Sequence, residues 1–579
     1  MFTHSGRKGR ILLWFFTAIL AGFGFSACSP EEAVDQPAGR EEVQRELRRA
    51  VEFFRTKVSN QGGYHFRYSS DLSYGRSESA EGSSQVTVQR GGTPVVGLAY
   101  LRAYETTGDA FYLEAARETA QVLARGQHCS GGWDYIIELD PTKRKNYPYR
   151  IDGDCLDQRL PESDGDAGKP PPQTTLDDNV TQAAIRLLMR VDRELKFQEE
   201  VIHEAALYAL DQLILAQYPN GAWPQRYFEF PDPAACPVKA ASFPESWSRR
   251  WPGPDYRSDY TLNDNAMLDM IDAFLEAARI YGEPRHRAAA EKGGDFLLRA
   301  QMPEPQPAWA QQYDVDMHPA WGRIFEPPSV TGSESQAVLK VLLVLYRETG
   351  KKKYLEPVPR AIDYLRRSGL DVRGSSILSR SRDCSPDELC LARFYELQTN
   401  RPLFISKGSR VRVRGGKSDL LDGYELTYSN EKVITHYGLW TSGRQLGQIA
   451  EEHRALLSAD PSTVGRPERL QGLSPWEGSP PSPSDTDLVA QVRNTLASLD
   501  SRGAWVEEGS IGKADNVVSL FAAEDMVVTI GDQAFSLGEN QTLSVYRGEK
   551  RPLERIISSK TFARNVGLLA AFLDQVQQP

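Results

Sequence analysis

Turns of one pattern recur along this chain, and they limit what it can fold into. Each places a glycine one or two positions before an aromatic residue, at the end of a stretch of helical character. Four such turns end in Tyr64, Trp133, Trp223 and Trp505, and a proline-containing version ends in Trp309. The stretches between them have room for a pair of helices and long loops. Such repeats predict helical hairpins packed side by side, with their loops gathered at one mouth.

Apolar residues recur at helical spacing over most of the chain. The predicted helices cover residues 42–58, 93–107, 111–125, 180–195, 199–217, 266–281, 286–301, 336–348 and 561–575. Their variable lengths and long loops favour a closed (α/α) toroid, or barrel, over an open solenoid. Alternating residues within 516–546 predict a small β-like insertion near the C-terminus. We therefore expect an all-α toroid over 41–430, completed by helices and flexible or β-like insertions over 431–579.

The N-terminus predicts export from a bacterial cell. Three basic residues, Arg7, Lys8 and Arg10, precede a short apolar run over 11–25. This run is shorter than a typical membrane-spanning helix and is typical of a secretory signal. Cys28 follows small residues, which predicts a lipoprotein cleavage site with Cys28 lipidated; the alternative is an ordinary cleaved signal. We expect a signal peptide over 1–28, a flexible tether over 29–40, and a periplasmic or outer-membrane-anchored protein that meets the membrane only through its lipid.

Cysteine count and charge narrow the class further. Six cysteines in 579 residues are too few for a disulfide framework, and an oxidising compartment allows pairs at 129–155 and 384–390, which would leave Cys236 free. The formal net charge of −10 argues against nucleic-acid binding. It does not exclude an acidic sugar, because a basic cleft can lie on an acidic protein.

Two polar clusters stand at predicted helix starts. Asp177, Asp178 and Asn179 follow the segment TTL (174–176), and a similar segment, YTLNDN (260–265), opens a later helix. Aspartate is a common helix cap, so each residue alone has a structural explanation. Both clusters together offer the oxygen ligands that Ca²⁺ prefers. We treat them as equivalent positions of two repeats that face one mouth, with metal binding and double capping both open.

Arginines and glutamines accompany aromatic residues at several predicted loops. The groups are WPQRY (223–227), WAQQY (309–313), WGR (321–323) and ARFY (392–395). Core packing and hydrogen bonds to helix carbonyls explain any one of them. Taken together, they fit carbohydrate recognition, because aromatic rings stack on sugars and arginines form paired bonds with carboxylates. The pattern predicts an acidic carbohydrate as the partner.

These motifs, in this order, resemble pectate lyases of polysaccharide lyase family 10. The resemblance covers roughly residues 95–405 and is carried by SGGWDY (130–135), TTLDDNVTQAAIRLL (174–188), NGAWPQRY (220–227), YTLNDNAM (260–267), WAQQYD (309–314), GRIFEPPSVTGSES (322–335) and ARFYELQTNRPLF (392–404). A weaker likeness continues to TFARNVGLLAAFL (561–573). Several long motifs in order are more specific than one short motif.

The resemblance implies cleavage of polygalacturonate by Ca²⁺-assisted β-elimination. It implies Arg323 as the base and Asp177 and Asp264 as calcium ligands. The implied substrate contacts are Asp178, Asn179, Trp223, Gln225, Arg226, Asn263, Asn265, Tyr313, Glu334 and Arg393. Two departures from the family pattern are Asn265, where a further aspartate is expected, and the 230–260 loop, which is longer than expected.

Two other functions fit the same residues. An inverting glycosidase would use Asp177 and Asp264 as a pair of carboxylates about 6.5–9.5 Å apart. A surface lipoprotein could instead bind pectin fragments without turnover. We expect the protein to be a monomer in each case. Unsaturated products distinguish the lyase from both alternatives.

Overall fold

The computed structural model describes residues 39–575 except 154, 156–172, 371–383, 385–387, 407–410, 415–424, 430–439, 461–463, 465–486, 512–513, 522–524, 531–532, 538–541 and 550–552. The predicted signal peptide, Cys28 and most of the tether therefore lie outside the described residues, as does the expected boundary at 430–431. Among the helices of the described part, none is both long and apolar enough to cross a membrane.

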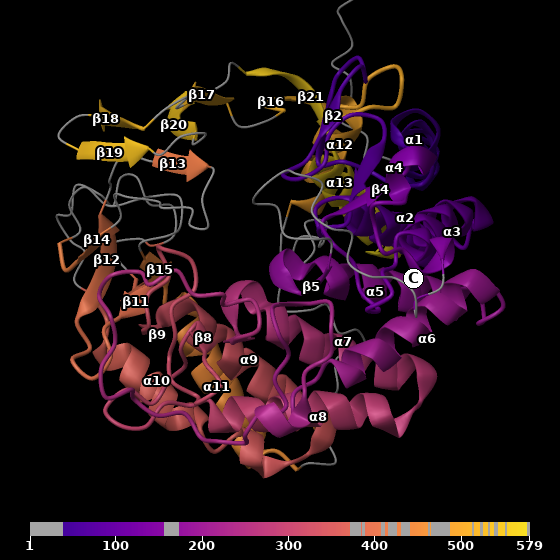
Figure 1. The fold of residues 1–579 in the computed structure, drawn as a ribbon. Coiled ribbons are helices and arrows are strands. Elements are labelled where there is room, and N and C mark those ends of the chain that lie inside the picture. The colour runs from indigo at the N-terminus through magenta and orange to yellow at the C-terminus, as the bar shows by residue number, and fades with distance from the viewer. Residues whose placement is uncertain are drawn as a thin grey trace, which may run out of the picture.

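Successive helical hairpins follow one another around an arc (Figure 1). The inner helices are α2 (Thr93–Thr107), α5 (Val180–Glu194), α7 (Ala266–Tyr281), α9 (Gly332–Thr349) and α13 (Ser559–Gln575). Each packs beside the next, in the order α13, α2, α5, α7, α9. The other long helices are α1 (Arg40–Phe53), α3 (Ala110–Arg125), α6 (Glu200–Leu215), α8 (Pro284–Arg299), α10 (Val358–Arg367), α11 (Arg444–Ser458) and α12 (Leu488–Ala497). Of these, α3, α6 and α8 are outer helices, and each packs against the inner helix before it. This arrangement confirms the predicted α/α toroid architecture.

Small antiparallel strand pairs lie at the mouth, the end where the inner helices begin. The pairs are β3 (Gln85–Thr87) with β4 (Ile136–Glu138), β5 (Thr174–Thr175) with β6 (Arg226–Tyr227), β7 (Tyr260–Thr261) with β8 (Gln312–Tyr313), and β9 (Val330–Thr331) with β11 (Phe394–Tyr395). In every pair the first strand leads into an inner helix, and the second follows the next outer helix. The same register therefore repeats around the mouth.

The glycine turns are bonded to the helices that precede them. Gly131, Gly221 and Gly503 all have φ between 92° and 96°, a left-handed region that favours glycine. The indole nitrogen of the tryptophan that follows donates to a carbonyl of the preceding helix, as Trp223 does to Leu213 at 2.8 Å. Trp133, Trp309 and Trp505 repeat this bond. The repeated turn found in the sequence therefore has a structural role, because its tryptophan fixes the turn to the end of the preceding helix.

The C-terminal helix and strand pack against the N-terminal elements. Helix α13 packs against α1 and α2, and β21 (Glu554–Ser558) pairs with β1 (Arg67–Ser69) in the register of the other mouth pairs. One continuous apolar core runs from Val43 to Leu573. The expected β-like insertion is confirmed by the sheet β13 (Val411–Arg414), β20 (Thr542–Glu549) and β17 (Ala514–Phe521), and by the hairpin β18 (Met526–Ile530) and β19 (Gln533–Leu537).

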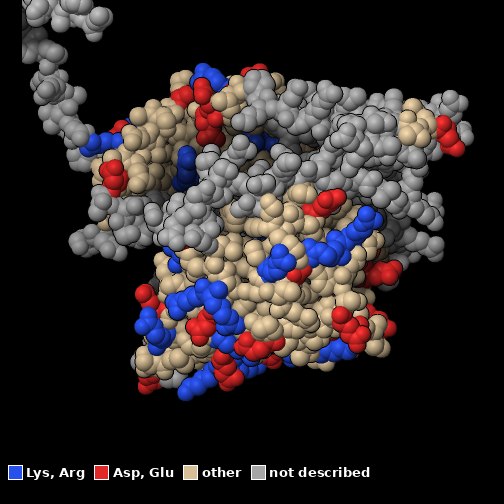
Figure 2. Space-filling model, turned by 90° about the vertical axis from the view of Figure 1, so that its left-hand side faces the viewer, with Lys and Arg blue, Asp and Glu red and all other residues tan. Residues whose placement is uncertain are grey.

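Most predicted helices match the observed ones to within two residues. Helix α9 differs, because it begins at Gly332 rather than at Gln336, so Glu334 lies in its first turn instead of a loop. Helix α10 was not predicted, and α11 and α12 lie in the part that was expected to be helical without predicted bounds. On the face shown in Figure 2, basic and acidic side chains are interspersed over the lower part.

Candidate active site

Two turns of identical backbone shape begin α5 and α7. Asp178 and Asn179 have φ of 50° and 58°, and Asp264 and Asn265 have φ of 48° and 59°. Consecutive left-handed residues other than glycine are uncommon, although Asn and Asp tolerate this region best. The two turns are short helical segments that contact each other, Asp177–Asn179 and Asn263–Asn265. The equivalence predicted from the sequence is confirmed.

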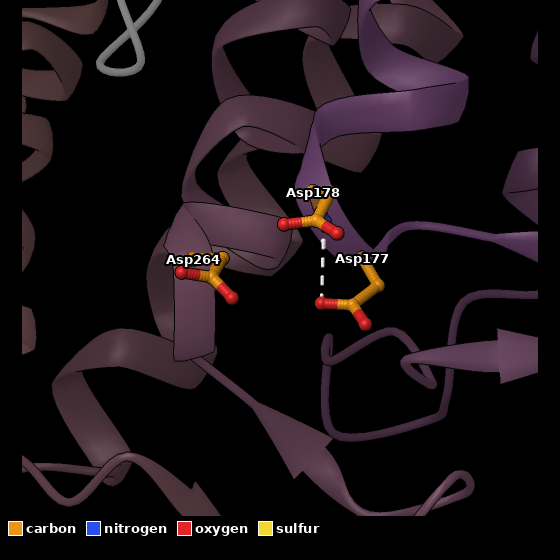
Figure 3. A group of neighbouring side chains, drawn as sticks. All are labelled: Asp177, Asp178 and Asp264. Carbon is orange, nitrogen blue, oxygen red and sulfur yellow. Dashed lines mark hydrogen bonds between the residues drawn. The ribbon is translucent and has the colours of Figure 1, made fainter. Parts of the chain in front are cut away.

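The turns bring three carboxylates together at the mouth (Figure 3). Asp177, Asp178 and Asp264 each offer an oxygen, and these oxygens lie within 4.8 Å of one another. Asp264 is exposed at the mouth, but partial desolvation of its carboxylate by the surrounding protein, followed by the charges of Asp177 and Asp178, raises its pKa to about 7. Burial and then Asp177 also raise the pKa of Asp178. The cluster is electrostatically crowded in a way that a bound cation would relieve.

A buried network of polar side chains contacts the turn Asp177–Asn179. The Asn179 side-chain amide donates to Asp269 on α7 at 2.6 Å. Asp269 in turn acts electrostatically on Arg186 of α5, which donates to Asp272 at 3.0 Å. Because the Asn179 nitrogen is bonded to Asp269, the amide orientation is fixed and its oxygen is left as the group that can face a cation.

Arg226 on β6 holds Asp177 from the side. Its guanidinium donates to the Asp177 carboxylate and to the Tyr135 hydroxyl, both at 3.0 Å, and Tyr135 itself donates to Asp177 at 2.9 Å. Burial opposes the charged guanidinium, but Tyr135 and Asp177 outweigh it and raise the pKa of Arg226. Gln89, after β3, donates to Asp178 at 3.1 Å.

Arg323 lies on the loop between β8 and β9, with 38% of its side chain exposed. Its guanidinium donates to Glu326 at 2.6 Å, and Glu326 also accepts from the Arg323 backbone N–H at 2.7 Å. Arg323 acts electrostatically on Asp178 and on Asp264. The arginine therefore stands beside the carboxylate cluster and keeps a surface toward the mouth.

A third arginine, Arg393, also acts on the cluster. Arg393, between β10 (Cys390–Ala392) and β11, donates to Glu334 at 3.1 Å and approaches Gln311 at 3.4 Å. It also acts electrostatically on Asp264. Arg226, Arg323 and Arg393 thus come from three separate segments to one site. The sequence predicted them as members of aromatic–arginine groups, without showing that they meet.

Two predicted substrate contacts are wrong. Trp223 and Tyr313 are buried in the core, with 1% and 0% of their surfaces exposed. Trp223 stacks on Phe274, and the Tyr313 hydroxyl donates to the Ala300 carbonyl at 2.6 Å. Their aromatic faces are used in packing, so no sugar can reach them.

Four further predicted contacts differ in their exposure. Gln225, Asn263 and Glu334 are buried beside the site, and Asn263 donates to Asp264 at 2.9 Å. Asn265 is partly exposed on the second turn. Two residues that bond to the cluster, Tyr135 and Gln89, were not predicted. Tyr135 follows a glycine–tryptophan turn, and Gln89 belongs to no motif. The SGGWDY motif was the available signal for Tyr135.

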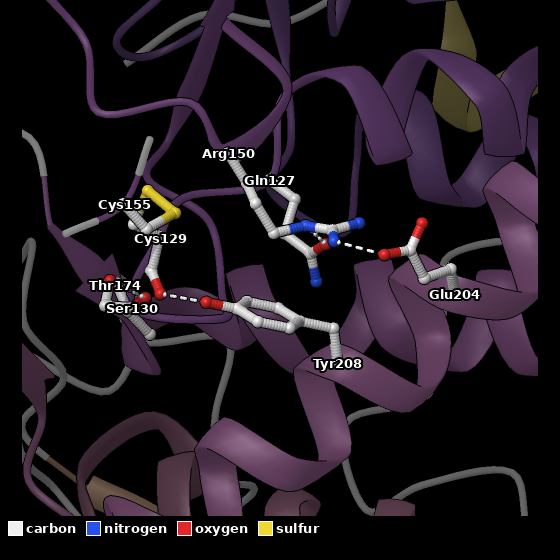
Figure 4. Close-up of a disulfide and its surroundings, with 8 residues drawn as sticks. All are labelled: Gln127, Cys129, Ser130, Arg150, Cys155, Thr174, Glu204 and Tyr208. Atoms are coloured by element: carbon white, nitrogen blue, oxygen red, sulfur yellow. Dashed lines mark hydrogen bonds and ion pairs between the residues drawn. A yellow bond between two sulfur atoms is a disulfide. The ribbon is translucent and has the colours of Figure 1, made fainter. Parts of the chain in front are cut away.

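A disulfide ties the wall of the site together (Figure 4). Cys129 pairs with Cys155, and the Tyr208 hydroxyl donates to the Cys129 carbonyl at 2.7 Å. The neighbouring Ser130 shares a hydrogen bond of 2.7 Å with Thr174, three residues before Asp177. Cys384 pairs with Cys390, and Cys236 is the free cysteine among the described residues. The pairing allowed by the sequence is confirmed.

The mouth of this α/α toroid thus carries three carboxylates and three arginines. Residues 157–414 match the family model for pectic acid lyase. Over this segment, which makes up less than half of the chain, the sequence is similar to the pectic acid lyases. No curated protein matches the chain.

Solved structures give a weaker likeness. A variant of a family 10 polysaccharide lyase from Cellvibrio cellulosa, in complex with trigalacturonic acid, is 21% identical, with 61% of this chain and 98% of that chain covered and a TM-score of 0.38. The family 10 polysaccharide lyase from the same organism is 23% identical over 52% and 82%, with a TM-score of 0.34. A GH76 α-mannanase from Bacteroides thetaiotaomicron is 10% identical over 93% and 96%, at 0.36. These values are too low to carry a functional conclusion.

Proposed function

We propose that the protein is a pectate lyase that cleaves α-1,4-linked polygalacturonate by Ca²⁺-assisted β-elimination. The proposal is carried by one observation: Arg323 stands beside a cluster of three carboxylates, close enough to act electrostatically on Asp178 and Asp264. Such a cluster suits a hard cation, and arginines suit the carboxylates of the substrate.

The residues present fit a calcium ion. Asp177, Asp178 and Asp264 would supply carboxylate oxygens, and Asn179 would add a neutral oxygen. Desolvation and then like-charge crowding raise the pKa values of Asp178 and Asp264, and a cation would offset the crowding. When bound, Ca²⁺ would neutralise the galacturonate carboxylate and stabilise the negative charge that develops next to it.

The reaction removes a proton and a leaving group from one sugar. Arg226 and Arg393 orient the galacturonate carboxylate, which lies next to C5. Arg323 accepts the C5 proton, the C4–O bond breaks, and a C4=C5 double bond forms. The leaving oxygen takes a proton from water. No oxidant or reductant is needed, and the product carries an unsaturated uronate end.

An arginine base requires an alkaline medium. The free guanidinium loses its proton only above about pH 12, and Glu326 further stabilises its charged form. Eliminative activity should therefore rise toward alkaline pH. A profile that is flat, or that peaks in acid, would contradict Arg323 as the base.

The inverting glycosidase would use Asp177 and Asp264 as its pair of carboxylates, and its product would carry no unsaturated end. The non-catalytic binder differs from the lyase in turnover alone.

The test uses polygalacturonate as substrate and the ultraviolet absorbance of the unsaturated product as the readout. Absorbance should increase with Ca²⁺, stop with a chelator, and return when Ca²⁺ is added in excess. Reducing ends without absorbance would establish a hydrolase. Binding without either signal would establish the binder.

Export and lipidation at Cys28 form a separate part of the proposal, supported by the N-terminal sequence. Cells fed a labelled fatty acid should label the wild type but not Cys28→Ser. A monomer is expected, and light scattering of the protein lacking residues 1–28 checks it.

A further inference from the structure

We propose that residues 248–257, the strap, form one wall of the substrate cleft and that Tyr256 contacts the bound galacturonate chain. The inference rests on the proposed pectate lyase activity and adds a specificity-determining residue to it. The strap belongs to the 230–260 loop. Long loops in compact proteins are usually functional or disordered, and this one is tethered at both ends.

One end of the strap is bonded to the loop that carries Arg323. The Trp251 indole donates to the Gly322 carbonyl at 2.8 Å. In return, the Trp321 indole donates to the Ser248 carbonyl at 2.8 Å. Both bonds involve the two residues directly before Arg323. They therefore fix the strap to the loop of the proposed base.

The other end is bonded to the strand that carries Arg226. The Arg226 backbone N–H donates to the Arg257 carbonyl at 3.1 Å. Arg257 is held in turn by Asp255, whose carboxylate accepts two bonds of 2.7 Å from the guanidinium. The strap therefore runs from the Arg323 loop to β6, between two of the three arginines of the site.

Tyr256 lies between these two tethers. The charged groups that act on its hydroxyl include Glu326, Arg323, Arg226 and Asp177, all of them site residues. Burial, followed by the charge of Glu326, raises the pKa of Tyr256, so its hydroxyl stays protonated in alkaline solution. It can then donate a hydrogen bond to a carboxylate or hydroxyl of an acidic sugar, while its ring borders the sugar face.

A further contact holds the strap from outside. Arg249 forms an ion pair with Glu396, and the Tyr428 hydroxyl donates to the same carboxylate at 2.7 Å. A strap fixed at this many points has little conformational freedom to lose when a ligand binds. It is suited to a binding contact that is formed in advance.

The test compares Tyr256→Ala and Tyr256→Phe with Tyr104→Phe. Tyr104 is also a half-buried tyrosine, but it lies in the last turn of α2, at the end remote from the mouth. KM and kcat are measured on trigalacturonate and polygalacturonate, and thermal unfolding is followed in parallel. Binding of trigalacturonate is then measured by calorimetry in the Arg323→Ala background, with and without Tyr256→Ala.

Tyr256→Ala should raise KM and the dissociation constant for trigalacturonate about tenfold or more, with kcat changed far less. Tyr256→Phe should show part of this loss, and Tyr104→Phe none. Unchanged binding in the Tyr256 variants of an active enzyme overturns the inference, as does a lower kcat and Tm at constant KM. If the wild type makes no unsaturated product, the lyase proposal fails, while weaker binding in Tyr256→Ala still supports the strap.

Discussion

Asp178 and Asp264 occupy the same position in two successive helical hairpins. Both adopt a left-handed backbone directly before the residue that precedes an inner helix, with φ of 50° and 48°. Each points its carboxylate toward the other hairpin's turn (Figure 3). A cation bound there would join two repeats rather than sit within one, so metal binding and hairpin packing should stabilise each other.

Replacement of Arg323 by alanine should lower kcat on polygalacturonate by about 10²–10⁴-fold, the range expected for loss of a general base. The change also leaves Glu326 buried without its guanidinium partner. Arg323→Ala/Glu326→Gln therefore serves as the control, because it removes that buried charge. Activity of either variant within twofold of the wild type would exclude Arg323 as the base.

Asp264→Asn should stabilise the metal-free protein at pH 8. The folded-state pKa of about 7 lies above the ordinary value of 3.8, so the folded protein prefers the protonated form. Stability from this group is present at low pH and is lost as pH rises from about 4 toward 7. The Tm in chelator should thus rise in the variant at pH 8 and change less at pH 5.

The same variant should lose the increase in Tm that Ca²⁺ gives the wild type. Asp363→Asn, on an exposed position of α10, is the matched control and should behave as the wild type does in both respects. A calcium response that survives in Asp264→Asn would remove Asp264 from the set of metal ligands.

Asp269→Ala should weaken Ca²⁺ binding about 10–100-fold, because the Asn179 amide loses the acceptor that orients it. Asp272→Ala is the matched control: it is also buried on α7 and accepts from Arg186, but no bond links it to Asn179 in the described network. Both variants should be less stable, yet only Asp269→Ala should show the change in calorimetric affinity. Equal affinities would refute the orienting role.

Gly221→Ala should destabilise the fold by about 3 kcal/mol or more. Gly221 has φ of 95°, and an added Cβ would lie 2.0 Å from the Lys292 carbonyl oxygen, which is part of a helix backbone. Gly282→Ala, with φ of 72° and open space around the added carbon, should lose only about 1 kcal/mol. Urea unfolding of the two variants measures the difference; similar losses would mean that the backbone contact is unimportant.

The sequence was sufficient for the hairpins and for the pair of acidic turns, because both depend on local patterns. Apolar spacing located α2 and α7 to the residue, and the repeated TL-Asp/Asn segments identified Asp178 and Asp264. It was misleading for Trp223 and Tyr313, since a tryptophan after a glycine turn looks the same whether it faces a sugar or a core. Only the fold distinguishes these cases, through the bond from the Trp223 indole to the helix behind it.

Long-range partners could not be predicted. Tyr135 and Arg226 are far apart in sequence and meet only because consecutive outer helices return to one mouth. The position of the strap is harder still to predict, because it has little regular structure. Its contacts with the Arg323 loop depend on two indole hydrogen bonds, which leave no periodic pattern in the sequence.

The two acidic turns share one backbone shape but carry different charges. At equivalent positions, one hairpin has Asp177 paired with Arg226, whereas the other has the neutral residues Asn263 and Gln312. The repeated scaffold therefore presents an asymmetric set of charges, and an acidic chain that crosses the mouth meets a different surface at each of the two hairpins.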